Sequence, residues 1–341
     1  MNVYTITFHS AHNYGAVLQA YALQKYLKMI KKDGVVACVD YRPDYTIPHI
    51  IHRRSNENPI KWTAHNAIAL PSRIKRKNGF NHFIDKYISI VSLNEAKGDK
   101  TAVLIAGSDQ IWNKKITGGQ LDPMFIFDEF SSEFKYSYAA SIGSSQTEDV
   151  VEVGNKLKDL KFIGIREEDT VNVLRDLGYA NVILNVDPVF LLEAEDYKSI
   201  EKQLQSSDYI FVYTLETSVN EVKNKIQDAK IKYPGCKVVS LGSFKNIYGS
   251  DVHYKTATPE EFLGLIIHAK CVITNSFHVT AFSVMFDKPV SSIPLRNGRG
   301  GRIETLLKIV NHQGDFSEYD KTNLNTLIHD SKQYLQRIID R

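Results

Sequence analysis

A histidine stands at the start of a predicted helix, directly after a short apolar strand. Residues Cys271–Thr274 predict the strand, and His278 opens a helix that ends near Phe286. Between them, Asn275 and Ser276 form a polar turn, and both are candidate substrate ligands. Ligands bind at the carboxyl ends of strands in open α/β sheets. The first helical turn offers N–H groups to an anion, and a histidine there can exchange a proton with that anion. Alternatively, His278 packs between helix and sheet with both ring nitrogens satisfied.

Arg166 follows another predicted strand, residues 161–165, and precedes a run of acidic residues that opens a helix. A guanidinium at a strand end suits bidentate recognition of a carboxylate or phosphate. It equally suits a salt bridge, for which the sequence offers Glu167, Glu168 and Asp169. The residues alone leave both interpretations open.

Small and polar residues also end the predicted strand 101–106. Gly107 permits a ligand to approach the backbone closely, and Ser108 beside it is a candidate substrate ligand. Asp109 is a candidate base, although a carboxylate at this position also suits the cap of the following turn.

The loop after the first predicted strand, residues 3–8, contains three candidate substrate ligands, Asn13, Tyr14 and Gly15. This loop lacks the G-x-G-x-x-G pattern, so a dinucleotide is not indicated. In the alternative interpretation, Asn13 caps the helix that follows and Gly15 relieves a tight turn.

A second group of cations follows the predicted strand 290–293. The glycine-rich loop 296–302 carries Arg296, Arg299 and Arg302. Together with Arg166 and His278, these cations suit an anionic, phosphate-bearing substrate. Residues with metal-ligand spacing are not evident, so we expect no metal.

Strand and helix patterns alternate along the chain, which predicts an α/β fold with two Rossmann-like domains. We expect an N-terminal domain over residues 1–190, a C-terminal domain over residues 208–320 and a terminal helix over residues 321–341. The polar, helix-like stretch 191–207 marks the boundary. A cleft between two such domains is a frequent place for a substrate pocket.

The composition is that of a globular protein with an ordinary core. The 341 residues suffice for about two domains, and 43% of them are hydrophobic and 24% charged. The net charge of +3 does not indicate nucleic acid. Cys38, Cys236 and Cys271 are expected to be reduced. No signal-peptide or membrane-spanning pattern is evident, so we predict a cytoplasmic location.

Residues 42–100 form a basic insertion in the N-terminal domain, weakly patterned for a helix. Its cations are interleaved with histidines and aromatic residues: the cations are Arg53, Arg54, Lys61, Arg73, Lys75, Arg76 and Lys77, and the others are His49, His52, His65, His82, Trp62 and Phe80. Such a stretch can meet a phosphate-bearing ligand or the anionic inner face of a membrane. A solvated helical face is the simpler interpretation.

Six motifs occur in order along the chain: TFHSAHNYGAVLQAYALQKYL, VLIAGSDQIWN, SYAASIG, IREEDT with LRDLGY, VDPVFLL, and VITNSFHVTAFSVMFDKPV. Together they resemble the polysaccharide pyruvyl transferases, from Thr5 to about Leu307, with the weakest cover over 42–100 and 215–258. The resemblance implies a fold similar to the glycosyltransferase B type. It also implies transfer of pyruvate from phosphoenolpyruvate to a sugar of a surface polysaccharide or its precursor. The product is a cyclic ketal, phosphate is released, and no cofactor is expected.

The resemblance carries roles to single positions. Arg166 matches the arginine of the family's RE motif, which makes it a ligand for the donor's carboxylate or phosphate. His278 follows the S-F motif, which makes it an acid–base residue. In the position after this histidine, family members often carry glycine or alanine, and this chain has Val279. Some members carry a lysine downstream, where this chain has only the arginines of the 296–302 loop. Asp109 or Glu167 is the candidate base.

Two other functions suit the same residues. A nucleotide-sugar glycosyltransferase of the same fold also binds an anion at a helix start, so the fold does not separate the two enzymes. The released product does, because one enzyme releases phosphate and the other a nucleotide. A glycan- or lipid-binding relative without activity would not need His278. The expected partners are phosphoenolpyruvate and a sugar or lipid-linked glycan, without nucleic acid.

Overall fold

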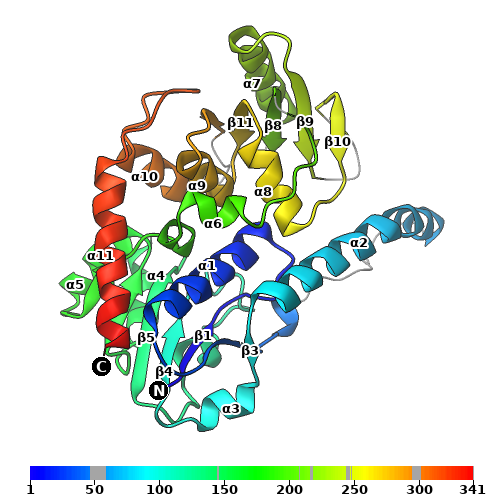
Figure 1. Ribbon diagram of the computed structural model, residues 1–341. Helices are drawn as coiled ribbons and strands as arrows, with labels where there is room; N and C mark the ends of the chain where they lie inside the picture. The colour runs from blue at the N-terminus through cyan, green and yellow to red at the C-terminus, as the bar shows by residue number, and fades with distance from the viewer. Residues whose placement is uncertain are drawn as a thin grey trace. The chain divides into compact units, whose positions relative to one another are not determined.

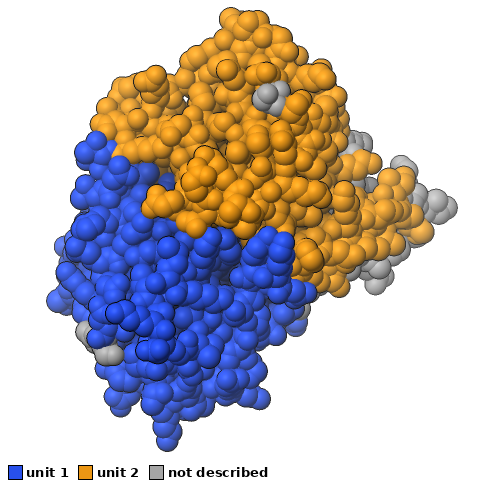
Figure 2. Space-filling view, in the orientation of Figure 1, with its two compact units in different colours: residues 1–47, 84–192, 322–341 blue, residues 48–83, 193–321 orange. Residues whose placement is uncertain are grey.

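The computed structural model (Figure 1) describes residues 1–46, 59–143, 146–206, 208–215, 218–242, 246, 248–293 and 301–340, without the side chains of residues 59–62, 64, 65 and 301. The chain divides into two compact units, coloured separately in Figure 2. Unit 1 comprises residues 1–47, 84–192 and 322–341, and unit 2 comprises residues 48–83 and 193–321.

Unit 1 is built on a parallel seven-stranded sheet in the order β3-β2-β1-β4-β5-β6-β7. The strands are β1 (Val3–Ile6), β2 (Val36–Val39), β3 (Ile90–Val91), β4 (Val103–Ala106), β5 (Phe134–Ala140), β6 (Phe162–Ile165) and β7 (Val182–Leu184). The helices are α1 (Tyr14–Ile30), α3 (Leu93–Gly98), α4 (Thr147–Gly154), α5 (Glu168–Asp176) and α11 (Thr322–Ile339), with 3-10 turns η1 (Asp44–Thr46), η2 (Pro123–Ile126) and η3 (Pro188–Leu191).

Unit 2 is built on a parallel five-stranded sheet in the order β10-β9-β8-β11-β12. The strands are β8 (Tyr209–Tyr213), β9 (Lys237–Leu241), β10 (Val252–Tyr254), β11 (Cys271–Thr274) and β12 (Val290–Ser292). The helices are α6 (Ala194–Lys198), α7 (Val219–Lys232), α8 (Pro259–Ile267), α9 (Phe277–Met285) and α10 (Gly301–Ile309). Helix α2 (Pro59–Tyr87) begins in unit 2 and ends in unit 1. Within the described ranges, no helix is long and apolar enough to span a bilayer.

Apolar runs and local capping signals explain these elements. Strands β1, β2 and β4 are buried along their whole length, as parallel strands covered on both faces must be. Asn13 caps α1 by accepting N–H bonds from Gly15 and Ala16 at 2.9 and 3.4 Å. Thr258 and Glu261 form a capping box on α8. The predicted α/β class with two Rossmann-like sheets is confirmed.

The terminal helix α11 belongs to unit 1 because buried hydrogen bonds tie it to the strands. The Tyr334 hydroxyl donates to the Ser137 carbonyl at 2.7 Å, and the Val186 N–H donates to Ser331 Oγ at 3.0 Å. The sequence had set this helix apart as its own segment. It had also assigned the stretch 42–100 to the N-terminal domain, whereas the contacts divide that stretch between the two units.

The shortest elements lacked a sequence signal. Strands β3 and β10 contain two and three residues, which is too short for a periodic pattern. In the stretch 191–207, where the sequence predicted helix, the structure has the five-residue helix α6, directly after the 3-10 turn η3 that ends at Leu191.

Each sheet has one switch point, where chain connections leave in opposite directions. In unit 1 the chain moves from β1 to β2 on one side and from β4 to β5 on the other. In unit 2 the corresponding strands are β8 and β11. The carboxyl ends of these strand pairs are therefore where ligand-binding groups are sought.

Candidate functional site

At the switch point of unit 2, two side chains join the ends of β8 and β11. Asn275 is fully buried, and its Oδ1 accepts the Leu215 N–H at 2.7 Å. The Thr274 hydroxyl donates to the Tyr213 carbonyl at 2.7 Å. Asn275, a candidate ligand from the sequence, thus holds the two strand ends together.

Helix α9 starts at this strand end, and the side chain of its N-cap residue does not cap the first turn. Ser276 is the N-cap residue and is 8% exposed, but its hydroxyl makes no capping hydrogen bond. The Ser276 carbonyl accepts the Thr280 N–H at 3.0 Å, so the helix is regular from its first turn. Such a helix start combines N–H donors with the positive end of the helix dipole, and it suits an anion.

A cation and an imidazole flank the Phe277 ring in that first turn. The Arg302 guanidinium, at the start of α10, lies 5.7 Å from the ring centroid. The His278 ring lies 5.3 Å from the same ring, at 81° to its plane. The structure therefore brings Arg302 and His278 to one helix start. The other two predicted arginines, Arg296 and Arg299, lie outside the described residues.

At the switch point of unit 1, a buried polar network joins β1, β4 and α1. The Thr7 hydroxyl donates to the Ser108 carbonyl at 2.8 Å and accepts Gln19 Nε2 at 2.9 Å. The Ser108 N–H donates to Gln19 Oε1 at 3.3 Å. Ser108, predicted as a substrate ligand, is fully buried within this network.

The neighbouring candidates have structural partners as well. A Cβ on Gly107 would lie 2.2 Å from the Tyr138 carbonyl oxygen, so β5 makes the close approach that the sequence attributed to a ligand. Asp109 is half-buried at φ 73°, and its Oδ1 accepts the Gln110 N–H at 2.8 Å. Asp109 therefore caps the following turn, which was the alternative interpretation of this residue.

The first-loop candidates form the start of α1. Asn13 is exposed and caps that helix, as its alternative interpretation held. Tyr14 and Gly15 are buried in the first turn. Gly15 is helical, and the tight turn expected there is not present.

Arg166 forms a buried ion pair. Its side chain is 4% exposed, and Nη1 donates to Asp187 Oδ2 at 2.6 Å, with Glu167 Oε1 3.7 Å from Nε. Burial lowers the pKa of Arg166, but Asp187, Glu167 and Asp109 outweigh burial and raise it, so the guanidinium stays charged. Asp187 was not among the sequence's salt-bridge partners, because it lies 21 residues away.

His9 is a second buried basic side chain, and it was not among the candidate residues from the sequence. Its side chain is fully buried, with Nε2 3.4 Å from Asp40 Oδ1 and Nδ1 3.3 Å from the Thr7 carbonyl. Burial lowers the pKa of His9, but Cys38, Asp40 and Thr7 outweigh burial and raise it to about 10. The nearby His9 ring lowers the pKa of Asp40 to about 2. The signal was a histidine directly after the predicted strand 3–8.

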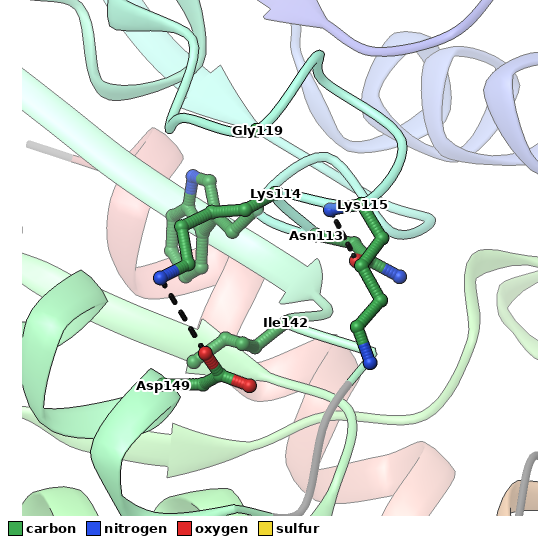
Figure 3. A pocket seen from close by; sticks show the side chains of 7 residues that line it. Asn113, Lys114, Lys115, Gly119, Ile142 and Asp149 are labelled. Atoms are coloured by element: carbon green, nitrogen blue, oxygen red, sulfur yellow. Dashed lines mark hydrogen bonds and ion pairs between the residues drawn. The ribbon is translucent and has the colours of Figure 1, made fainter.

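A small pocket of about 180 Å³ lies beside the loop that follows β4 (Figure 3). Lys114 Nζ lies 3.4 Å from Asp149 Oδ1, and the Lys115 N–H donates to Asn113 Oδ1 at 3.0 Å. The volume of this pocket is below the roughly 300–1,000 Å³ of typical ligand pockets. Because its polar groups largely bond one another, we assign it no substrate.

Comparison with protein families gives one assignment. A family model described as polysaccharide pyruvyl transferase matches residues 13–296, most of the chain. The match includes Arg166 and His278. No curated protein sequence matches.

Solved structures share the architecture at low sequence identity. A protein designated a UDP-N-acetylglucosamine 2-epimerase from Listeria monocytogenes has 10% identity and a TM-score of 0.52, over 100% of this chain and 90% of its own. The UDP-GlcNAc 2-epimerase from Neisseria meningitidis bound to UDP-GlcNAc has 11% identity and a TM-score of 0.49, over 100% and 94%. The first likeness confirms the glycosyltransferase B type of fold.

Replacing Arg166 by alanine should destabilise the protein, whatever its effect on ligands. The Asp187 side chain is fully buried, and losing its partner costs about 3–5 kcal/mol. Thermal unfolding of Arg166→Ala measures this loss. The double variant Arg166→Met/Asp187→Asn should recover at least half of it, and equal losses in both variants would contradict the pairing.

The buried His9 should make stability fall at alkaline pH. Because folding raises the pKa of His9, its contribution is full below about pH 6.5 and is lost as the pH rises toward about 10. Between these values, the free energy of unfolding should fall by about 1.4 kcal/mol per pH unit more in wild type than in His9→Gln. His329→Gln, on exposed helix surface, is the control. Parallel curves for wild type and His9→Gln would refute the raised pKa.

Proposed function

The chain belongs to the polysaccharide pyruvyl transferase family, and we propose that it transfers pyruvate from phosphoenolpyruvate to a sugar of a surface polysaccharide or its precursor. Family membership supports a transferase, and the donor, acceptor and residue roles are our proposal. The acceptor is a free or lipid-linked glycan that presents two neighbouring hydroxyls. Phosphoenolpyruvate is the donor substrate, and the proposed reaction uses no cofactor.

The start of α9 carries the proposal. Ser276 does not cap the first turn, so the N–H groups and helix dipole there suit the phosphate of the donor. Arg302 beside the same turn suits the donor's carboxylate or phosphate, because a guanidinium binds both in bidentate fashion. His278 lies close enough to this anion site to serve as the acid–base residue.

The proposed reaction replaces the phosphate ester at C2 of the donor with two sugar ether bonds. Protonation of C3 makes a methyl group and leaves C2 electrophilic. One sugar hydroxyl then adds to C2 and gives up its proton. The second hydroxyl displaces phosphate, which breaks the bond between C2 and the phosphate oxygen and closes the ketal. The two hydroxyl protons balance the proton gained by C3 and the proton that leaves with phosphate. Arginines stabilise the charge that moves onto phosphate.

The candidate residues of unit 1 have roles in the proposed reaction as well, and the role of Arg166 depends on its ion pair. Arg166 binds the donor only if a donor anion replaces the Asp187 carboxylate in its ion pair. Asp109 or Glu167 is the proposed base for the sugar hydroxyl. Ser108 and Gly107 shape the strand end that carries Asp109.

Donor titration tests the function. We would titrate the protein with phosphoenolpyruvate, UDP and UDP-N-acetylglucosamine, and measure phosphate release from phosphoenolpyruvate in the presence of glycan acceptors. Saturable phosphoenolpyruvate binding with acceptor-dependent phosphate release supports the proposal. Binding of the nucleotide sugar alone would replace it with a glycosyltransferase.

Removing the Arg302 guanidinium should weaken donor binding. A hydrogen bond to a charged group contributes about 1.5–3 kcal/mol, so Arg302→Ala should raise the Kd for phosphoenolpyruvate by about 10- to 100-fold. Calorimetric titration measures the change. Arg302→Lys should retain part of the affinity, and Arg337→Ala, on exposed surface of α11, should bind as wild type does. Unchanged affinity in Arg302→Ala would remove this residue from the donor site.

Removing the His278 imidazole should slow turnover and leave donor binding in place. General acid–base catalysis contributes about 10²–10⁴-fold, so His278→Ala should lower kcat within that range. Steady-state phosphate release gives kcat, and titration with phosphoenolpyruvate gives the Kd. His329→Ala controls for loss of a histidine at an exposed position. Full activity of His278→Ala would end the acid–base assignment.

A further inference from the structure

Helix α2 concentrates positive charge. Its 29 residues contain one acidic residue, Asp85, and six basic residues: Lys61, Arg73, Lys75, Arg76, Lys77 and Lys86. This gives the helix a formal charge of +5, whereas the whole chain carries +3, so the rest of the chain carries −2. Residues 59–84 contain no acidic residue at all. The mild net charge of the protein therefore conceals one strongly cationic element.

One face of α2 anchors the helix. Ala69, Phe80 and Phe83 are buried, and at 100° per residue they fall within one narrow sector of the helix. The Arg76 guanidinium lies 5.3 Å from the Phe80 ring centroid, on the same side. Arg73 is half-buried and donates to Asn66 Oδ1 at 2.6 Å. Neither arginine belongs to the outward face.

The opposite face presents an apolar stripe to solvent. Ala67, Leu70, Pro71 and Ile74 are all exposed, and the helical period gathers them into a single arc of about 100°. Leu70 is 37% exposed and Ile74 is 42% exposed, while the adjacent Ile68 reaches 70%. A purely solvated face would carry polar residues in this arc, and here a leucine, a proline and an isoleucine occupy it.

Lysines border this stripe on both sides. Lys77 and Lys75 are exposed and fall just beyond the two edges of the arc formed by Leu70, Pro71 and Ile74. Long lysine side chains can lie along an apolar surface while their ammonium groups reach outward. An apolar centre with cationic borders matches the interface of an anionic bilayer, where acyl chains lie beneath phosphate headgroups.

We propose that the outward face of α2, defined by Ala67, Leu70, Pro71, Ile74, Lys75 and Lys77, binds the surface of an anionic phospholipid bilayer. The helix lies along the interface, with the apolar stripe toward the acyl chains and the two ammonium groups among the phosphates. Charge complementarity selects a membrane over an acidic protein groove, because the cations lie at the edges of the stripe and residues 59–84 of the helix contain no carboxylate. This inference is independent of the proposed function.

Vesicle sedimentation tests the proposal. The full-length protein is mixed with vesicles of equal parts phosphatidylglycerol and phosphatidylcholine, and with vesicles of phosphatidylcholine alone. We expect sedimentation with the anionic vesicles only, weakening as salt rises because the attraction is screened. Equal sedimentation with both vesicles, or with neither, would overturn the proposal.

Two variants separate charge from apolar contact. Each lysine near an anionic surface contributes about 1 kcal/mol, so neutralising Lys75 and Lys77 in a double glutamine variant should weaken binding about 30-fold. Ile74→Ser should weaken binding about 10-fold, because it removes an apolar side chain that would be buried in the bilayer. All three substituted residues are exposed in the free protein, so the fold should persist, which circular dichroism checks.

The matched control makes the same charge change elsewhere in unit 2. Lys223 and Lys230 are exposed on helix α7, and their double glutamine variant should sediment as wild type does. An equal loss in this control would show that overall charge drives binding, and would overturn the assignment to α2. Duplex DNA that binds with the same dependence on Lys75 and Lys77, but not on Ile74, would replace the membrane by nucleic acid. Donor titration of every variant should match wild type, so a failure here is distinct from a failure of the proposed enzyme.

Discussion

Buried polar groups at the two switch points must find partners, and this constraint shapes both units. Where neighbouring parallel strands send their chains apart, the backbone loses its sheet neighbours, and an unsatisfied buried group there is costly. Unit 1 meets the requirement with Thr7, Gln19 and Ser108, and unit 2 meets it with Thr274 and Asn275. Some polar residues at the strand ends therefore hold neighbouring strands together, and the others are candidates for binding a ligand.

The two units differ in the charge at these edges. In unit 1, Arg166 has three carboxylates acting on it, from Asp109, Glu167 and Asp187, so this edge offers an anion little net attraction. In unit 2, a helix start that its N-cap residue Ser276 does not cap through its side chain lies beside Arg302. The donor's negative charge is thus better matched by the second edge, and this difference decides where we assign the phosphate.

Patterns of neighbouring residues predicted most of the helices and strands. Such patterns could not predict contacts between residues that are far apart in the chain. The strand at 271–274 and the cap at Asn13 followed from the sequence, because apolar runs and capping residues act within a few positions. The partner of Arg166 did not, because the sequence offered adjacent carboxylates and the fold supplies Asp187. Asn275 and Gly107 were recognised as special positions, but only the structure shows that protein groups satisfy them.

The buried bonds of α11 also affect the order in which the protein can fold during synthesis. Most of unit 1 is made before unit 2, yet its last helix follows residue 321, the final residue of unit 2. Until then, the Ser137 carbonyl lacks the Tyr334 hydroxyl, and the Val186 N–H lacks Ser331. A nascent chain that folds from its N-terminal side therefore holds an open face on the first sheet while the whole second sheet is translated. Synthesis begins with unit 1 and also ends with it. If translation stops shortly after residue 321, unit 2 is therefore complete, while unit 1 still lacks its last helix.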